Sequence, residues 1–327
     1  MSKLLRRFTY LMLLGIVVFL LTTACSLSRR EPPRSFLPAA HDCRMIKHSM
    51  GETCIPKSPQ RVVTIFHGIL GNALSFGVKP IASSTIFPEE PFPTYLKNQV
   101  DGVEPVGLQG MPDLEKILKQ KPDLILVWQN IQAIYPLLSK IAPTVIVPWR
   151  GPSAWREQIQ FVAKALSKEK ESQQLWKLYY QRVNRLKVAL DNQYQDKEIS
   201  VFSLSSQWGF FVMAKNSFSG SIINDLGLKR PKMQDVNTED GYISFTSEEQ
   251  LDIIDGNIMF VLTRKEEDRK AFEKIIKKPL GKKLKAVQQG QIYFIKDALP
   301  WNGATFPAAD IVLDDIEKYL VKVNSKK

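Results

Sequence analysis

Histidine is scarce in this chain of 327 residues: there are three, and none follows His67. Residues 67–72 read HGILGN, a pattern similar to the oxyanion loop of α/β-hydrolases. That fold also needs a G-x-S-x-G turn and a histidine late in the chain, and the sequence has neither. Paired catalytic carboxylates, phosphate-binding loops and clusters of metal ligands are missing too. The sequence therefore favours binding over catalysis, and we predict that the protein is not an enzyme.

Cysteine is also rare, with three in the chain, and the first lies in a distinctive N-terminal segment. Basic residues precede an apolar run at 8–21, small residues and then Cys25, which is the order of a secretory signal peptide. The run of about 14 residues is shorter than the roughly 20 needed to span a membrane. Its end resembles a bacterial lipobox, so we predict a signal peptide at 1–24, lipidation of Cys25 and a tether at 25–43. The protein is then exported and lipid-anchored at the periplasmic or extracellular face of a membrane.

The other two cysteines, Cys43 and Cys54, lie on either side of a predicted hairpin turn at 49–51. Outside the cytoplasm an even pair of cysteines is normally oxidised, which predicts a disulfide. The alternative is a metal site that includes His41 and His48. The spacing of these residues is a weak zinc signal because it contains no C-x-x-C pair.

The charge balance is basic, with 45 Lys and Arg against 33 Asp and Glu. Such a balance suits nucleic acid, an anionic membrane surface or an anionic ligand. The lysines are scattered over predicted helices, without an aromatic-interleaved stripe or a recognition motif. Nucleic acid is therefore not an expected partner.

The chain is organised around residues 168–192, a stretch without glycine or proline that predicts one long helix. At 1.5 Å per residue this helix would be roughly 37 Å long, enough to link two lobes. An ordinary surface helix is the alternative. In the predicted helix at 168–192, side chains recur at spacings of three and four residues and form one apolar face. This face consists of Leu175, Leu178, Tyr179, Arg182, Val183, Leu186 and Leu190.

The two sides of this helix resemble each other. Residues 115–127 and 249–261 both contain a glutamate, a predicted helix, a proline or glycine break and a strand at the same offsets. Alternation of helices and strands in both halves predicts an α/β fold with two Rossmann-like lobes and parallel sheets. The predicted ligand cleft lies between the lobes, because ligands of such sheets bind at the carboxyl ends of strands. The predicted divisions are an N-terminal lobe at 44–166, a rigid linker helix at 167–193 and a C-terminal lobe at 194–327.

Aromatic and basic residues follow several predicted strands. Tryptophan faces pack on flat or amphipathic ligands, and guanidinium groups pair with carboxylates and other oxyanions. For each tryptophan the alternative is a place in a lobe core, and for each arginine it is a surface salt bridge. The candidate ligand-binding residues are His67, Trp128, Arg150, Trp208, Arg264 and Trp301.

Five stretches carry a resemblance to a known family: 47–63, 76–82, 107–126, 139–147 and 288–320. They are similar to substrate-binding lipoproteins of bacterial iron-siderophore ABC importers, the helical-spine class of periplasmic binding proteins. Within this class they look most like the ferric-citrate and ferric-siderophore branch. The resemblance implies a monomer with two α/β lobes joined by a rigid helix, which close only slightly on the ligand.

The resemblance also implies partners and roles. Glu115 and Glu249 would pair with arginines of an ABC permease dimer that works with its ATPase, and Glu248 is a possible substitute for Glu249. By themselves these glutamates would stabilise their helices through the helix dipole. The ligand would be a ferric siderophore or ferric citrate whose own oxygens hold the iron, so no protein metal ligand and no cofactor is expected. Arg150 and Arg264 would neutralise the anionic chelate.

Two other functions remain open at this point. One is a haem or corrinoid binding protein of the same class, in which a haem ligand could only be His67, a tyrosine or a methionine. The other is a lipoprotein that kept the fold but serves as a scaffold without transport.

Overall fold

The computed structural model describes residues 43–149, 154–205 and 209–322. They belong to one compact unit, Pro38–Lys327. The predicted signal peptide, the lipidation site Cys25 and most of the predicted tether lie outside the described residues. Within the described ranges, no helix combines the length and the apolar character needed to cross a membrane.

A two-stranded antiparallel hairpin opens the described chain, with β1 (Cys43–His48) and β2 (Gly51–Pro56). The turn lies where the sequence predicts it. Cys43 and Cys54 are joined in a disulfide across the two strands, and their Cα atoms are 5.5 Å apart. The predicted hairpin and disulfide are therefore confirmed.

A six-stranded sheet follows, in the order β6-β5-β4-β3-β7-β8. All neighbouring pairs are parallel except β5 with β6. The central strands are almost entirely buried, as expected for a parallel sheet covered on both faces. The strands are β3 (Val62–Ile65), β4 (Ala82–Thr85), β5 (Glu104–Leu108), β6 (Met111–Pro112), β7 (Leu124–Trp128) and β8 (Thr144–Val147).

Short helices connect these strands, as the alternating pattern predicts. Asp113 begins one of them by accepting a hydrogen bond from the backbone N–H of Lys116 at 3.0 Å. The helices are α2 (His67–Ser75), η1 (Thr94–Leu96), α3 (Leu114–Lys119), η2 (Gln129–Ile134), α4 (Tyr135–Leu138) and α5 (Trp155–Leu166).

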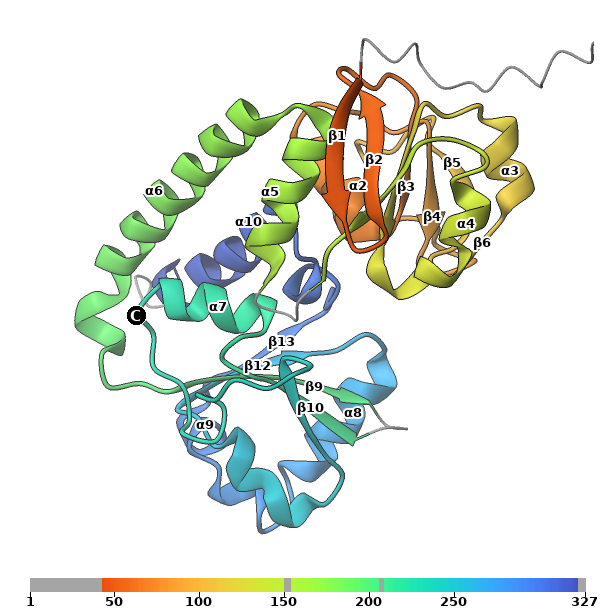
Figure 1. The fold of residues 1–327 in the computed structure, drawn as a ribbon. Helices are drawn as coiled ribbons and strands as arrows, with labels where there is room; N and C mark the ends of the chain where they lie inside the picture. The colour runs from red at the N-terminus through yellow and green to blue at the C-terminus, as the bar shows by residue number, and fades with distance from the viewer. Residues whose placement is uncertain (1–42, 150–153, 206–208, 323–327) are drawn as a thin grey trace, which may run out of the picture. The chain divides into compact units, whose positions relative to one another are not determined.

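The long helix α6 (Glu169–Tyr194) has 26 residues and confirms the predicted central helix (Figure 1). Tyr179, Val183 and Leu190 are buried along one face, as the spacing predicts. Leu178 is not part of that face, because 53% of its surface is exposed. Its assignment to the apolar face was wrong, since the apolar stripe of this helix is narrower than the sequence pattern suggests.

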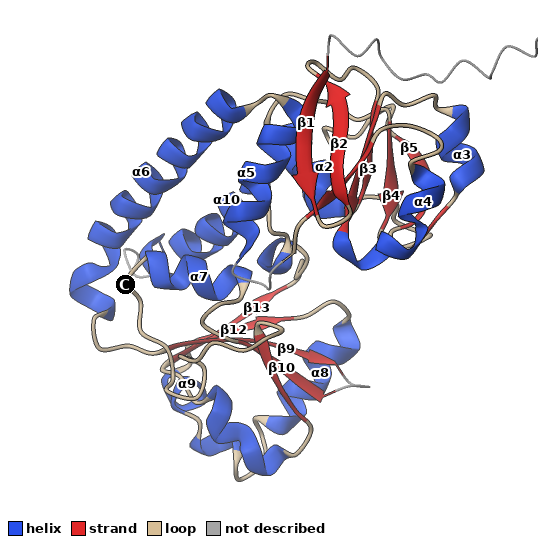
Figure 2. Cartoon of the chain, viewed as in Figure 1, coloured by secondary structure: helices blue, strands red, loops and turns tan. Residues whose placement is uncertain are grey.

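The second sheet has five strands in the order β11-β10-β9-β12-β13. β9, β12 and β13 are parallel, whereas β10 and β11 are antiparallel additions at one edge. The predicted parallel sheet is therefore confirmed for three strands within a mixed sheet (Figure 2). The strands are β9 (Ile199–Ser205), β10 (Gly209–Met213), β11 (Tyr242–Phe245), β12 (Ile258–Leu262) and β13 (Ile292–Ile295).

The helices around this sheet include one that returns to the first half of the chain. α10 contacts α2, α6 and α7, and the largest group of buried apolar side chains draws on both halves. The two sheets thus share this group, each sheet also has a buried cluster of its own, and the lobe boundaries remain a prediction. The helices are α7 (Phe218–Asp225), η4 (Glu248–Ile254), α8 (Glu266–Ile275), η5 (Gly281–Lys283), α9 (Lys285–Gln289), η6 (Pro300–Asn302), α10 (Phe306–Ile316) and η7 (Glu317–Lys322).

Candidate functional site

The parallel strands of the first sheet end at the same edge, where ligands of α/β sheets bind. β3, β4, β5, β7 and β8 all run in the same direction. Each strand has, at its last residue or within two residues after it, a side chain that can contact a ligand. In β7 this is the last residue of the strand. These residues are His67, Phe87, Gln109, Trp128 and Trp149.

Trp128 is the centre of an aromatic group at this edge. Its ring stacks on Phe66 with centroids 4.5 Å apart and an interplanar angle of 20°. Trp149 meets it edge to face at 6.0 Å. Among the described residues, none accepts a hydrogen bond from the buried indole Nε1 of Trp128. The aromatic contacts therefore fix the ring at this edge.

His67 is the first residue of α2 and joins the ends of β3 and β5. Its Nδ1 lies 3.1 Å from Oε1 of Gln109. Burial lowers the pKa of His67, and the weaker effect of the Gln109 hydrogen bond raises it. The ring is thus neutral at pH 7, with Nδ1–H donating to the amide oxygen. His67 lies at the predicted edge, but it brings no positive charge there, and its contact with a ligand remains a prediction.

Arg264 follows β12 of the second sheet and is exposed. Its guanidinium carbon is 4.5 Å from the ring centre of Phe87, which follows β4 of the first sheet. Thr94 also donates a hydrogen bond to Asp297, which follows β13. Residues that follow strands of the two sheets are therefore in contact. Among the predicted ligand residues that the structure describes, Arg264 carries the positive charge. Arg150 and Trp208 lie outside the described residues.

Trp301 does not belong to this site, and its prediction as a ligand-binding residue was wrong. The side chain is fully buried, with 0% of its surface exposed. Its Nε1 donates to Asp315 at 2.9 Å, and its ring lies 5.1 Å from that of Phe260. The reason is that η6 turns inward under α10 after the chain has left β13, so this tryptophan fills the core.

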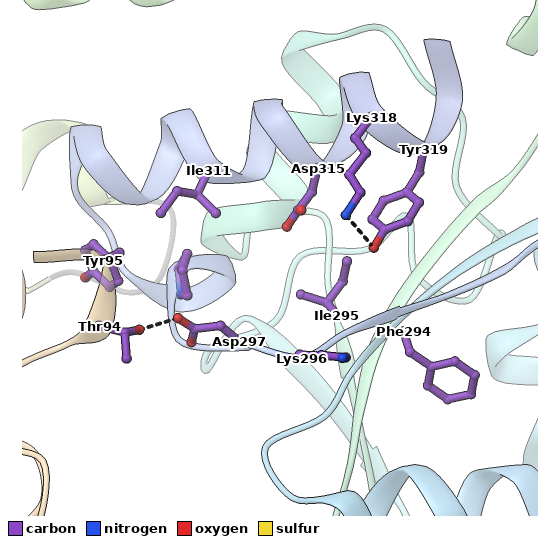
Figure 3. Close-up of a pocket in the computed structure, with 11 residues that line it drawn as sticks. Thr94, Tyr95, Phe294, Ile295, Lys296, Asp297, Ile311, Asp315, Lys318 and Tyr319 are labelled. Atoms are coloured by element: carbon purple, nitrogen blue, oxygen red, sulfur yellow. Dashed lines mark hydrogen bonds between the residues drawn. The ribbon is translucent and has the colours of Figure 1, made fainter. Parts of the chain in front are cut away.

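A hollow of about 510 Å³ lies beside β13, between η1 and the last helices of the chain (Figure 3). None of the four predicted ligand residues that the structure describes lines it. Its charged side chains are mixed in sign, with Lys296 and Lys318 beside Asp297 and Asp315. This balance selects neither anions nor cations. Across the ranges that the structure describes, no three His, Cys, Asp or Glu side chains form a candidate metal site.

Glu115 and Glu249 occupy matching positions in the two halves. Each is exposed in the first turn of a helix, α3 or η4, that precedes a central strand of its own sheet. The second helix is a 3₁₀ helix in which Ser247 caps the N–H of Glu249 at 3.2 Å. Glu248 accepts from Lys278 at 2.7 Å, so it is already engaged. This arrangement leaves Glu249 as the more accessible carboxylate of the two.

Three residues of the site, Phe87, Gln109 and Trp149, were not among the predicted ligand residues. Phe87 was missed because β4, which precedes it, reads ASST and lacks the apolar run that marks a buried strand. Gln109 was read as part of a turn. Both follow strands of the same sheet, so correct assignment of β4 and β5 would have predicted their position.

Comparisons with known proteins point to one family. Residues 81–299 match the family model described as periplasmic binding protein. The chain is 30% identical over 318 residues to the probable siderophore-binding lipoprotein YfiY of Bacillus subtilis, covering 94% of this chain and 96% of the relative. It is 28% identical over 282 residues to the Fe(3+)-citrate-binding protein YfmC of Bacillus subtilis, covering 85% and 86%.

A solved structure extends the similarity to three dimensions. Staphylococcus aureus SirA complexed with staphyloferrin B superposes with a TM-score of 0.76 at 30% sequence identity. The superposition covers 85% of this chain and 98% of SirA. From the family model, the similar sequences and the shared fold, we conclude that this chain belongs to the periplasmic binding protein family.

Proposed function

We propose that this protein is the substrate-binding component of a bacterial ABC importer, which captures a ferric siderophore or ferric citrate and delivers it to the permease. The observation that carries the proposal is the match with SirA complexed with staphyloferrin B, in sequence and fold, over most of both chains. The named ligands of the similar proteins YfiY and YfmC support the same ligand class. The protein captures its ligand without chemical turnover.

The strand-end residues suit such a ligand. The faces of Phe87, Trp128 and Trp149 can cover the organic rim of a chelate, and Arg264 can pair with its carboxylate or other oxyanion groups. Arg150 completes this cationic side in the proposal. The chelator's own oxygens hold the iron, so the protein recognises the whole complex as an anionic, partly apolar body.

Delivery uses Glu115 and Glu249 as the proposed contacts to the permease. The support is their exposure and their equivalent placement before β7 and β12. Lipidation of Cys25 would hold the protein at the membrane that contains the permease, which raises the effective concentration for docking.

The test is a titration of tryptophan fluorescence in the chain that begins after Cys25. The ligands are ferric citrate, a ferric hydroxamate, a ferric catecholate, haem and cobalamin. We expect saturable quenching by one class of ferric chelate, because Trp128 and Trp149 lie at the proposed site. Quenching by haem or cobalamin with no response to any ferric chelate would assign the protein to a different ligand class. Silence with all five would contradict a role in capture of these ligands.

A further inference from the structure

The segment between α8 and α9 is unusually basic. Half of the twelve residues at 274–285 are lysines, and none is acidic. All of these lysines are exposed. Leu280 lies in the middle of the segment, between two pairs of lysines, and 44% of its surface is exposed. The segment thus presents an exposed apolar side chain with exposed lysines on both sides of it in the sequence, and we name residues 277–283 the lysine knuckle.

The lysine knuckle is held in a fixed shape by its backbone. The N–H of Lys278 donates to the carbonyl of Ile275 at 3.0 Å, and the N–H of Lys282 donates to the carbonyl of Lys278 at 2.9 Å. Gly281 is buried against the end of α8, where a Cβ atom would lie 2.2 Å from the Ile275 oxygen. Only glycine fits that close approach. Leu280 is therefore held at the surface by a short, tightly bonded turn.

Neighbouring apolar residues anchor the knuckle on both sides. Leu284 is buried in the core of the second sheet, and Ile275 and Ile276 pack against the same core. Leu280 differs from these neighbours because it is exposed although the segment around it is well anchored. The exposed side chain of Leu280 is what we expect of a surface that a binding partner covers.

Most of the positive charge of the knuckle is not neutralised by the protein. Lys278 pairs with Glu248 at 2.7 Å. For Lys277, Lys282 and Lys283, no carboxylate of the described residues lies within ion-pair distance. The Lys278 pair also places the knuckle beside η4, which carries Glu249.

We propose that the lysine knuckle is a contact site for the anionic surface of a phospholipid bilayer. Lysines near such a surface each contribute to binding through attraction to acidic headgroups, and an apolar side chain among them enters the interface. Because the turn is already fixed, little ordering entropy is lost when it docks. The position of the knuckle beside Glu249 also favours a membrane contact. If the protein docks on a permease through Glu249, as proposed above, the adjacent knuckle lies close to the membrane. The proposal does not depend on which ligand the protein carries.

The test is sedimentation of the chain that begins after Cys25 with vesicles of phosphatidylcholine, with or without phosphatidylglycerol. This body contains both sheets and their cores in one compact unit, so it folds without the leader. We expect binding to the vesicles that contain phosphatidylglycerol, weakened by salt. The double substitution Lys282→Gln and Lys283→Gln should weaken binding by about 25-fold, at about fivefold for each lysine. Leu280→Ser should remove the part of the binding that resists salt.

The matched control replaces two exposed lysines on α6, Lys170→Gln and Lys177→Gln. This variant has the same net charge as the double variant of the knuckle, so its affinity for vesicles should change by less than about twofold if binding is local. An equal loss in both variants would overturn the proposal, because net charge alone would then explain binding. Equal binding to pure phosphatidylcholine, or none to either vesicle, would also overturn it. Ligand titrations of the knuckle variant should match those of the unaltered protein, which separates this test from that of capture.

Discussion

The disulfide between Cys43 and Cys54 offers a prediction whose size follows from the structure. It joins residues 11 positions apart, across a hairpin that is already paired along its length. Loop-closure entropy for a loop of this length gives about 2.8 kcal/mol at 25 °C in the chain-entropy account of disulfides. Replacing both cysteines, Cys43→Ser and Cys54→Ser, should therefore lower the free energy of unfolding by about 2.8 kcal/mol.

The hairpin should nevertheless stay in place in this variant. Ile46 and Ile55 are buried in the main core. The guanidinium of Arg44 donates to the carbonyls of Lys164 and Ala165 at 2.6 and 2.7 Å, which satisfies the open end of α5. Ligand affinity should be unchanged, because none of these contacts involves the residues at the strand ends.

The assay is urea unfolding followed by circular dichroism, with thermal unfolding as a second measure. For a body of this size a loss of 2.8 kcal/mol corresponds to a fall of about 5 °C in Tm. A reducing agent should lower the stability of the unaltered protein by the same amount and leave the double variant unchanged. No loss, or a loss well above 5 kcal/mol together with weaker ligand binding, would refute this reasoning. In the first case the bond would contribute nothing to stability, and in the second the hairpin would depend on the bond to stay in place.

Three further predictions concern single contacts. Asp225→Ala should destabilise the protein by about 2 kcal/mol in urea unfolding, because it removes the carboxylate that pairs with the partly buried Arg156 at 2.5 Å and accepts a hydrogen bond from the Tyr179 hydroxyl at 2.6 Å; no change in stability would contradict this prediction. Burial lowers the pKa of His67, so the unfolded chain takes up a proton below pH 6.5 that the folded chain does not. The protein therefore loses stability as the pH falls from 7 to 5, and His67→Gln should make this loss smaller. An unaltered pH profile of stability would contradict this prediction. Glu115→Gln and Glu249→Gln should each lower ligand-stimulated ATPase activity of the reconstituted importer without changing ligand affinity, and full activity in the double variant would rule out docking through these residues.

The sequence was sufficient to predict the central features of the fold. The helix predicted at 168–192 is α6 (Glu169–Tyr194), and the matching segments at 115–127 and 249–261 contain β7 and β12. Long apolar periodicity and continuous buried strands are strong local signals, since each reflects burial along a single element. A similar short motif follows a helix in each half, FGVKP at 76–80 and LGLKRP at 226–231. The glycines of both motifs have positive φ values, 75° at Gly77 and 72° at Gly227, as expected where a helix ends.

The errors arose where the path of the chain between elements decides the outcome. No strand was predicted directly after β9, yet Gly209–Met213 returns as the antiparallel strand β10. The run of aromatic and β-branched residues at Phe210, Phe211 and Val212 is the signal that could have predicted this strand. Trp301 was assigned to the site from its position after β13, but burial depends on how η6 folds under α10.

The contact between Phe87 and Arg264 also could not be predicted from the sequence. The two residues follow strands of different sheets and are far apart in the chain. The apolar pattern of β12 places Arg264 at a strand end, whereas β4 has no such pattern and gives no place for Phe87. The arrangement of the sheets then decides whether the two residues meet. Residues that follow strands could therefore be proposed from the sequence, but their grouping into one site required the structure.

The most direct test of the account is the affinity of an Arg264→Ala variant for the ferric chelate that the unaltered protein binds, measured by isothermal titration calorimetry. Arg269→Ala is the matched control, since Arg269 also stacks on a phenylalanine, 4.8 Å from the ring of Phe294, but lies on α8. Loss of a charge-assisted contact to the ligand should weaken binding by about ten- to a hundredfold in the Arg264 variant and leave the control unchanged. Unaltered affinity in the Arg264 variant, or an equal loss in both, would contradict the assignment of the ligand site to these strand ends.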